Sequence, residues 1–178
     1  MIKSVTGTVE VRGDNTVGGV GKTFSVTAGL LRVSHYNALG NGSNSAIISN
    51  NAAMELDGAS ISDKVDNAIT ITGTGSSAGV IRSINGDVTL SGAITLAGAS
   101  RINSDSGTLT IETGGINAAS ALNLTIGCAG NTAVSAAIGS NIGTLTKDDN
   151  GILTLASNNA YTGGTLISSG RIIASLNN

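Results

Sequence analysis

The sequence contains no proline and no tryptophan, and only 2% of its residues are aromatic. An ordinary globular core relies on large aromatic side chains. Here the interior must be filled by Val, Ile, Leu and Ala, which suits a narrow interior of stacked, similar layers. Because proline donates no hydrogen bond to a β-ladder, its absence favours a fold in which nearly every strand is paired on both sides.

Charge and cysteine are scarce as well. Charged residues make up 11% of the chain and the net charge is -2, so there is no basic footprint for nucleic acid. The 40% of hydrophobic residues is too high for intrinsic disorder. The single cysteine, Cys128, excludes an internal disulfide and a multi-cysteine metal site. We expect this side chain to be a small buried filler.

Long hydrophobic runs are also missing. No stretch approaches the ~18 apolar residues of a transmembrane helix, so we expect no membrane insertion by this segment. Residues 1–13 lack the continuous apolar run of a signal peptide. If the protein is secreted, we therefore expect this chain to be a mature piece of it or a portion cut from it.

Short apolar-x-apolar units recur along the whole chain, separated by Gly, Asn, Ser and Thr. Period-two alternation is typical of a strand with one buried face, and the intervening residues favour turns. The best helix candidate, residues 116–122, is too short to be convincing. The alternating units are Val9/Val11, Leu31/Val33, Met54/Leu56, Ile69/Ile71, Val88/Leu90, Ile94/Leu96, Leu109/Ile111, Leu122/Leu124/Ile126 and Leu153/Leu155.

Two all-β architectures fit such a pattern. A meandering sandwich or barrel usually has more aromatic residues and more outward-facing charge. A parallel β-solenoid stacks coils of roughly 20 residues at ~4.8 Å and lines up inward residues as ladders. Small and β-branched residues with many glycines favour the solenoid. We therefore predict one domain over residues 1–178, a parallel β-helix of roughly eight coils.

The stretch Val17–Thr23, VGGVGKT, is similar to a phosphate-binding loop. Such a loop needs an earlier glycine where Thr16 stands, and a helix directly after it. Residues 24–34 contain β-branched residues and a glycine, and they alternate as a strand does. We interpret VGGVGKT as an enlarged turn, and we expect Lys22 to be exposed and to bind no nucleotide.

The two ends of the chain resemble each other. Residues 9–19 align with residues 153–163, and residues 26–31 align with residues 167–172, with three extra residues in the first copy. VGGVGKT falls within this insertion. Its counterpart, residues 161–165, contains no lysine. We place the two copies at about residues 5–42 and 145–176, with degenerate coils between them.

The segment LTKDDNGILTLASNNAYTGGTLISSG, residues 145–170, resembles the strand repeat of autotransporter passenger domains. Asp149 and Ser157 stand where that repeat has glycine, and Val17 of the first copy stands where it has tyrosine. The resemblance implies a right-handed, single-stranded parallel β-helix on a bacterial surface. It implies no particular enzymatic activity.

Candidate chemical groups are few. His35 has no second histidine or cysteine nearby, so a turn position is favoured over catalysis or metal binding. Asp57, Asp63 and Asp66 could supply a carboxylate pair for sugar cleavage, but the segment lacks aromatic or arginine subsites, which favours solvated turn acids. We therefore predict no catalytic, cofactor-binding or metal-binding residues.

Three further motifs have simpler interpretations. Residues 148–151, DDNG, do not follow the calcium-binding nonapeptide, so we interpret them as a turn. Residues 12–14 spell RGD, a weak integrin motif whose glycine also occupies a repeat position. The pairs Thr70/Thr72 and Thr108/Thr110 should face outward, but they recur too irregularly for an ice-binding array.

The sequence leaves three functional hypotheses. The first is a non-enzymatic structural or adhesive segment of a surface-exposed or secreted passenger, with host or surface ligands possible and no cofactor. The second is a self-assembling filament subunit, and the third is a polysaccharide-degrading enzyme. The second rests on apolar ends: Ile2 and Val5 with only Lys3 and Glu10 as charged guards, and residues 172–176, IIASL.

Overall fold

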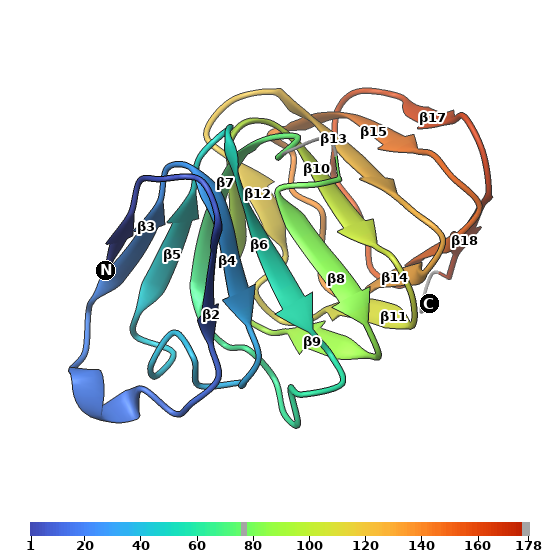
Figure 1. The fold of residues 1–178 in the computed structure, drawn as a ribbon. Coiled ribbons are helices and arrows are strands. Elements are labelled where there is room, and N and C mark those ends of the chain that lie inside the picture. Colours follow the sequence, from blue (N-terminus) through green and yellow to red (C-terminus); the bar gives the residue numbers. More distant parts are fainter. Residues whose placement is uncertain (76–77, 176–178) are drawn as a thin grey trace.

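In the computed structural model the chain winds into a stack of parallel strands with about eight turns (Figure 1). The structure describes residues 1–75 and 78–175. Leu176, which belongs to the expected apolar C-terminal edge, lies outside the described residues. Within the described part, the one helical element is a short 3-10 turn, η1 (Thr16–Gly18). The prediction of an all-β parallel solenoid is confirmed.

The strands lie on three faces of the solenoid. Successive strands start roughly ten residues apart, whereas a complete coil takes roughly twenty residues or more. Successive strands therefore lie on different faces. The first face contains β1 (Ile2–Lys3), β3 (Thr23–Val26), β5 (Ser45–Ile48), β7 (Ala68–Gly73), the start of β10 (Ile94–Ser104) and β12 (Ile116–Ala118).

The second face runs the full length of the molecule, and the third is made of strands only in its C-terminal part. The second face contains β2 (Thr8–Val11), β4 (Gly29–Val33), β6 (Ala52–Asp57), β8 (Ile81–Asn85), the end of β10, β13 (Leu122–Gly127), β15 (Ile142–Lys147) and β17 (Thr165–Ile167). The third face contains β9 (Val88–Leu90), β11 (Thr108–Ile111), β14 (Asn131–Val134), β16 (Ile152–Leu155) and β18 (Arg171–Ala174).

Strand β10 turns the corner between the first two faces without a break. Its start pairs with β7, Ile94 opposite Ile69, and its end pairs with β8, Ile102 opposite Ile81. Residues 116–122, the best helix candidate of the sequence, form β12 and the start of β13 instead. Pairing of Ile116 with Ile94 of the preceding coil overrides the weak helical pattern.

The core is a continuous apolar column inside the coils. The inward positions expected from period-two alternation are fully buried at Leu31, Val33, Leu109, Ile111 and Leu153, and Leu155 is nearly so. The prediction for Val9 and Val11 holds only in part. Val9 lies opposite Leu31 but is 37% exposed, and Val11 is half-buried, because β2 is the outermost strand of its face.

The outward threonines occupy the expected positions. Thr70 and Thr72 are half-buried and alternate with buried isoleucines on β7. Thr108 and Thr110 are half-buried too and alternate with the buried Leu109 and Ile111 on β11. Thr110 lies between Thr89 and Ala133 of the neighbouring coils, so the threonine row is interrupted.

Candidate functional site

The three acidic residues once considered for sugar cleavage lie at turns. Asp57 ends β6 and its Oδ2 accepts a hydrogen bond from Ser60 at 3.0 Å. Asp63 Oδ1 accepts from the Lys64 N–H at 2.7 Å, and Asp66 is exposed beside Gly42. No group of three or more His, Cys, Asp or Glu side chains within residues 1–75 and 78–175 is arranged to hold a metal ion.

His35 lies in the bend after β4. Its Nδ1 accepts the Asn37 N–H at 3.1 Å, and its ring stacks on Tyr36 with centroids 4.5 Å apart. Both the hydrogen bond to Nδ1 and the ring stacking are therefore contacts with residues of the same bend. The histidine therefore stabilises a turn.

VGGVGKT lies in the long connection between β2 and β3. Lys22 is exposed and is followed directly by strand β3 rather than by a helix. Its backbone N–H donates to Asn44 Oδ1 at 2.8 Å, so the amide that would face a phosphate is already engaged. The interpretation of the motif as an enlarged turn agrees with this geometry.

We expect no nucleotide binding at this turn. Titration of the protein with ATP or GTP at concentrations up to the millimolar range should release no binding heat in calorimetry. The Lys22→Ala variant should behave in the same way, because the lysine faces solvent without a helix N-terminus behind it. Micromolar binding that disappears in Lys22→Ala would contradict this geometry.

The RGD tripeptide is exposed, and its two charged side chains bond to neighbouring residues. Arg12 Nη2 donates to Glu10 Oε2 at 2.8 Å. Asp14 accepts the Thr16 N–H at 2.8 Å and an amide proton of Asn37 at 3.3 Å. The Asp14 carboxylate therefore binds the first N–H of η1, which gives this residue of the tripeptide a structural role.

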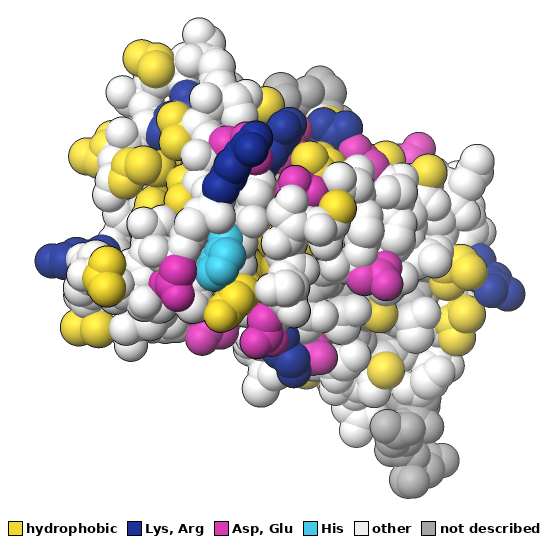
Figure 2. Space-filling view, turned by 60° about the horizontal axis from the view of Figure 1, so that its bottom comes forward, with side chains coloured by type: hydrophobic (Ala, Val, Ile, Leu, Met, Phe, Trp, Pro, Cys, Tyr) yellow, Lys and Arg dark blue, Asp and Glu magenta, His cyan; other side chains and the backbone are white. Residues whose placement is uncertain are grey.

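Several charged side chains and one cysteine form a row along the molecule, and we call this row the charged ladder. Figure 2 shows acidic and basic side chains next to one another along the solenoid. Each coil from the first to the seventh contributes one member. The first four lie opposite one another on β2, β4, β6 and β8, and the last three follow the ends of β10, β13 and β15. The members are Glu10, Arg32, Glu55, Arg82, Asp105, Cys128 and Asp149.

Glu55 is the central acid of the charged ladder. Its carboxylate is only 5% exposed and accepts from Arg32 Nη2 at 2.7 Å and from Arg82 Nη1 at 3.1 Å. Arg82 continues to Asp105, with Nε–Oδ2 at 2.7 Å. The hydrogen bonds with these carboxylates raise the pKa of both arginines. The Glu55 charge is thus enclosed by two cations from adjacent coils.

Cys128 corrects the expectation of a buried apolar filler. It is only partly buried and has a backbone φ of 83°, the left-handed region in which a cysteine is uncommon. At this corner the side chain points into the charged ladder rather than into the core. Its Sγ lies 3.4 Å from Asp105 Oδ1 and its N–H donates to Asp149 Oδ2 at 3.0 Å. Burial is the main cause of its raised pKa.

The DDNG segment is also held by protein groups. Arg101 on β10 reaches across two coils, with Nη2–Asp148 Oδ1 at 2.9 Å and Nη2–Asp149 Oδ2 at 2.8 Å. Both carboxylates are ion-paired with one guanidinium, which favours an ion-paired turn over a calcium site. Asp149 has a φ of 57°, so the glycine of the repeat pattern is replaced here by a residue that tolerates this conformation.

Replacing Glu55 by alanine should destabilise the protein by about 1–3 kcal/mol, because two partly buried arginines would lose their common acceptor. Thermal or urea unfolding measures this change. Glu112→Ala is the matched control, since the ion-pair partner of Glu112 is the exposed Lys64, and this change should alter stability by less than about 1 kcal/mol. Equal stability of Glu55→Ala and the wild type would show that the ladder is not structural.

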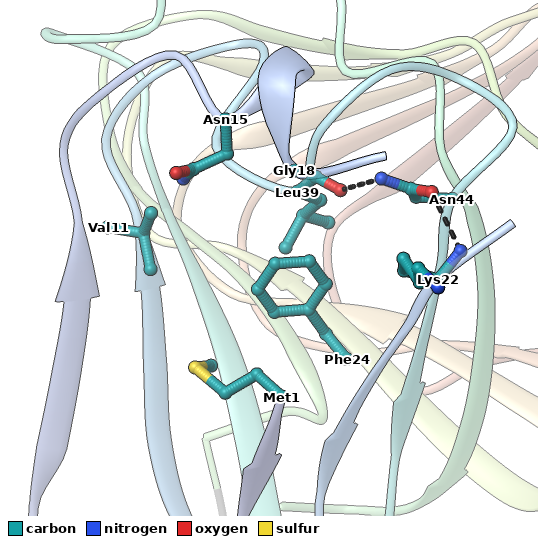
Figure 3. A pocket seen from close by; sticks show the side chains of 8 residues that line it. All are labelled: Met1, Val11, Asn15, Gly18, Lys22, Phe24, Leu39 and Asn44. Carbon is teal, nitrogen blue, oxygen red and sulfur yellow. Dashed lines mark hydrogen bonds between the residues drawn. The ribbon is translucent and has the colours of Figure 1, made fainter. Parts of the chain in front are cut away.

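A hollow of about 350 Å³ opens at the N-terminal end of the stack (Figure 3). Phe24 and Leu39 point toward one another at its centre, and the Asn44 amide closes one side by donating to Leu39 O at 3.1 Å. The hollow is lined by Met1, Val11, Asn15, Gly18, Lys22, Phe24, Leu39 and Asn44. Its mainly apolar lining is the exposed end of the solenoid interior.

Two lysines occupy inward positions that the sequence reasoning had not recognised as buried. Lys147 is 2% exposed and its Nζ donates to Asp148 O and, at 2.8 Å, to Asp149 O. Lys3, expected to guard the edge as a charged residue, is 5% exposed and donates to Val5 O. In both cases the stem lies in the core and the ammonium group holds the carbonyls of the next corner.

We call a buried lysine and the corner carbonyls that it holds a lysine corner. The lysine corner at Lys147 should make the unfolding free energy depend on pH. Burial lowers the pKa of Lys147 in the folded state. Unfolding then takes up a proton between that pKa and the ordinary value, so stability rises with pH across this interval. In a Cys128→Ser background, unfolding free energy from pH 7 to 10.5 should rise more steeply with Lys147 present than in Lys147→Met. Parallel profiles for the two proteins would contradict the assignment.

The fold and these contacts define the molecule as a parallel β-solenoid whose ionisable groups serve mainly to join its coils. Residues 145–174 match the family model of the passenger-associated-transport-repeat. The last two coils are therefore this repeat, and the expected likeness to an autotransporter passenger segment is confirmed. No curated protein and no solved structure matches the chain.

Proposed function

We propose that this chain is a non-enzymatic, structural segment of an autotransporter-like passenger that presents binding surfaces away from a bacterial cell. The observation that carries the proposal is the unbroken apolar column from Val26 to Leu155, covered by a ladder of mutual ion pairs. Eight coils stacked at the strand spacing give a rod about 40 Å long. The transport repeat favours secretion to the cell surface or the extracellular space.

An enzymatic role is less well supported. Sugar cleavage needs two carboxylates facing one substrate bond. Asp57 and Asp63 instead bond to Ser60 and to the Lys64 backbone within their own turns. Asp148 and Asp149 are paired with Arg101. These contacts favour structural roles for the acids.

Surface display tests the proposal. The chain should be placed behind a signal peptide and an N-terminal epitope tag and in front of a translocator barrel in a Gram-negative host. We expect antibody and added protease to reach the tag on intact cells, and cells with the segment to adhere more than cells displaying the tag and barrel alone. Retention of the tag inside the cell would overturn the proposal.

A parallel assay addresses catalysis. The purified chain should release no reducing ends from a panel of polysaccharides. Release that disappears in Asp57→Asn or Asp63→Asn would identify an enzyme instead. Because the first assay measures location and adhesion and the second measures turnover, the two results are independent.

A further inference from the structure

The two ends of the solenoid are built from the same two-coil unit. In the first unit, Lys3 of β1 lies opposite Val26 of β3, and Val9 of β2 lies opposite Leu31 of β4. In the last unit, β15 to β18 repeat this arrangement in the same order. Their corresponding pairs are Lys147 with Ile167 and Leu153 with Ile172.

The corners of the two units agree in detail. Gly29 has a φ of 74°, and a Cβ there would lie 2.7 Å from both Lys3 Nζ and Val5 O. Gly170 has a φ of 72°, and a Cβ there would lie 2.8 Å from Lys147 Nζ and would also strike Asp149 O. Each lysine corner therefore requires a glycine in the coil that follows it. The family match covers only the second unit, and the geometry of these corners extends the likeness already visible in the sequences of the two ends.

The units occupy different faces. Strand β2 belongs to the second face, whereas its counterpart β16 belongs to the third. If a second molecule continued the stack without rotation, β18 would lie against residues 12–22 of that molecule. This segment contains η1 and no strand, so it offers β18 no partner strand. A rotation by one face instead places β17 against β1 and β18 against β2 of the next molecule.

Both ends offer open strand edges and apolar side chains. Strands β1 and β2 end the strand order at one end, and β17 and β18 end it at the other, among the described strands. The inward-facing Val9 is 37% exposed and Ile167 is 52% exposed. Figure 2 shows hydrophobic side chains at the N-terminal end on the left and again at the opposite end. Unpaired edges of this kind template the addition of another chain.

We propose that a second copy of this chain docks head to tail on the first, with β1 on β17 and β2 on β18, rotated by one face of the solenoid. The chain contains a precedent for the contact. In the coil that precedes Lys147, β13 places Ile126 opposite Lys147, and β14 places Thr132 opposite Leu153. The docked copy repeats this register with Ile167 opposite Lys3. A head-to-tail contact of this kind continues without closing and produces a polar filament.

Cross-linking between two single-cysteine proteins tests the register. In a Cys128→Ser background, the Arg171→Cys protein is mixed with the Thr8→Cys protein. The proposed register sets Ile172 of one molecule opposite Val9 of the next, so the outward residues 171 and 8 become neighbours at a distance that a disulfide spans. We expect at least ten times more cross-linked dimer than with Leu166→Cys plus Thr8→Cys, the pair that unrotated stacking would join. Preference for the Leu166 pair, or no cross-link with either, overturns the proposal.

A second measurement addresses the open edge. The Ser175 N–H donates to Leu155 O, so by alternation the Ala174 N–H points away from β16, toward the docking site. Ala174→Pro removes that donor. In sedimentation over a wide concentration range, the wild type and Ala174→Ser should form species of at least twice the monomer mass, and Ala174→Pro should stay monomeric. A wild type that remains monomeric, or a proline variant that assembles equally well, refutes the docking.

Discussion

Replacing Leu153 by aspartate is expected to destabilise the protein by at least about 4 kcal/mol, because an unpaired carboxylate would enter a fully apolar column. Leu153 is completely buried on β16, between Thr132 of the preceding coil and Ile172 of the following one. No cation of the charged ladder contacts this position. The carboxylate must therefore be protonated or its coil must separate from the stack.

Urea unfolding of Leu153→Asp measures this loss. Thr154→Asp is the matched control, since its side chain is one residue further along the same strand and faces outward. The control should change the unfolding free energy by less than about 1 kcal/mol. If both variants had the wild-type midpoint, Leu153 would not belong to the core.

Substituting alanine for Gly29 should cost about 2–4 kcal/mol, since the methyl group is forced into a left-handed backbone conformation and against a buried lysine. The Cβ would lie 2.5 Å from Gly7 O in addition to its contacts with the lysine corner. Gly170→Ala should give a loss of similar size, because Gly170 occupies the same place in the second unit.

Gly18→Ala provides the control for both glycine variants. Gly18 lies in η1, a Cβ there would meet no atom within 4 Å, and its φ is not in the left-handed region. Melting temperatures should separate the three proteins, with Gly18→Ala within about 2 °C of the wild type and the other two lower by several degrees. A wild-type melting temperature for Gly29→Ala would remove the basis for treating the lysine corner as a tight contact.

The two glycine predictions also explain what the repeat does locally. A lysine places its stem in the core and its ammonium group on the carbonyls of its own corner, and a glycine in the next coil leaves room for that corner. The pattern contains no side chain specific to one face of the solenoid. It can therefore form at the corner before β2 and at the corner before β16.

The sequence by itself determined the fold class. Alternating pairs such as Leu31/Val33 and Leu109/Ile111 show which residues face inward, because the period of a strand depends only on local backbone geometry. The same reasoning rejected VGGVGKT as a phosphate loop, since a strand pattern follows Lys22. The likeness of residues 145–170 to the passenger repeat was also visible in the letters alone.

Only the tertiary structure decided which residues become neighbours across coils. Arg32 and Glu55 are separated by 23 residues, but Glu55 and Arg82 by 27, because corners differ in length from coil to coil. For this reason the charged ladder had no constant period by which to find it, and Cys128 was wrongly expected in the core. The burial of Lys3 and Lys147, and the different faces of the two end units, likewise depend on how each corner turns.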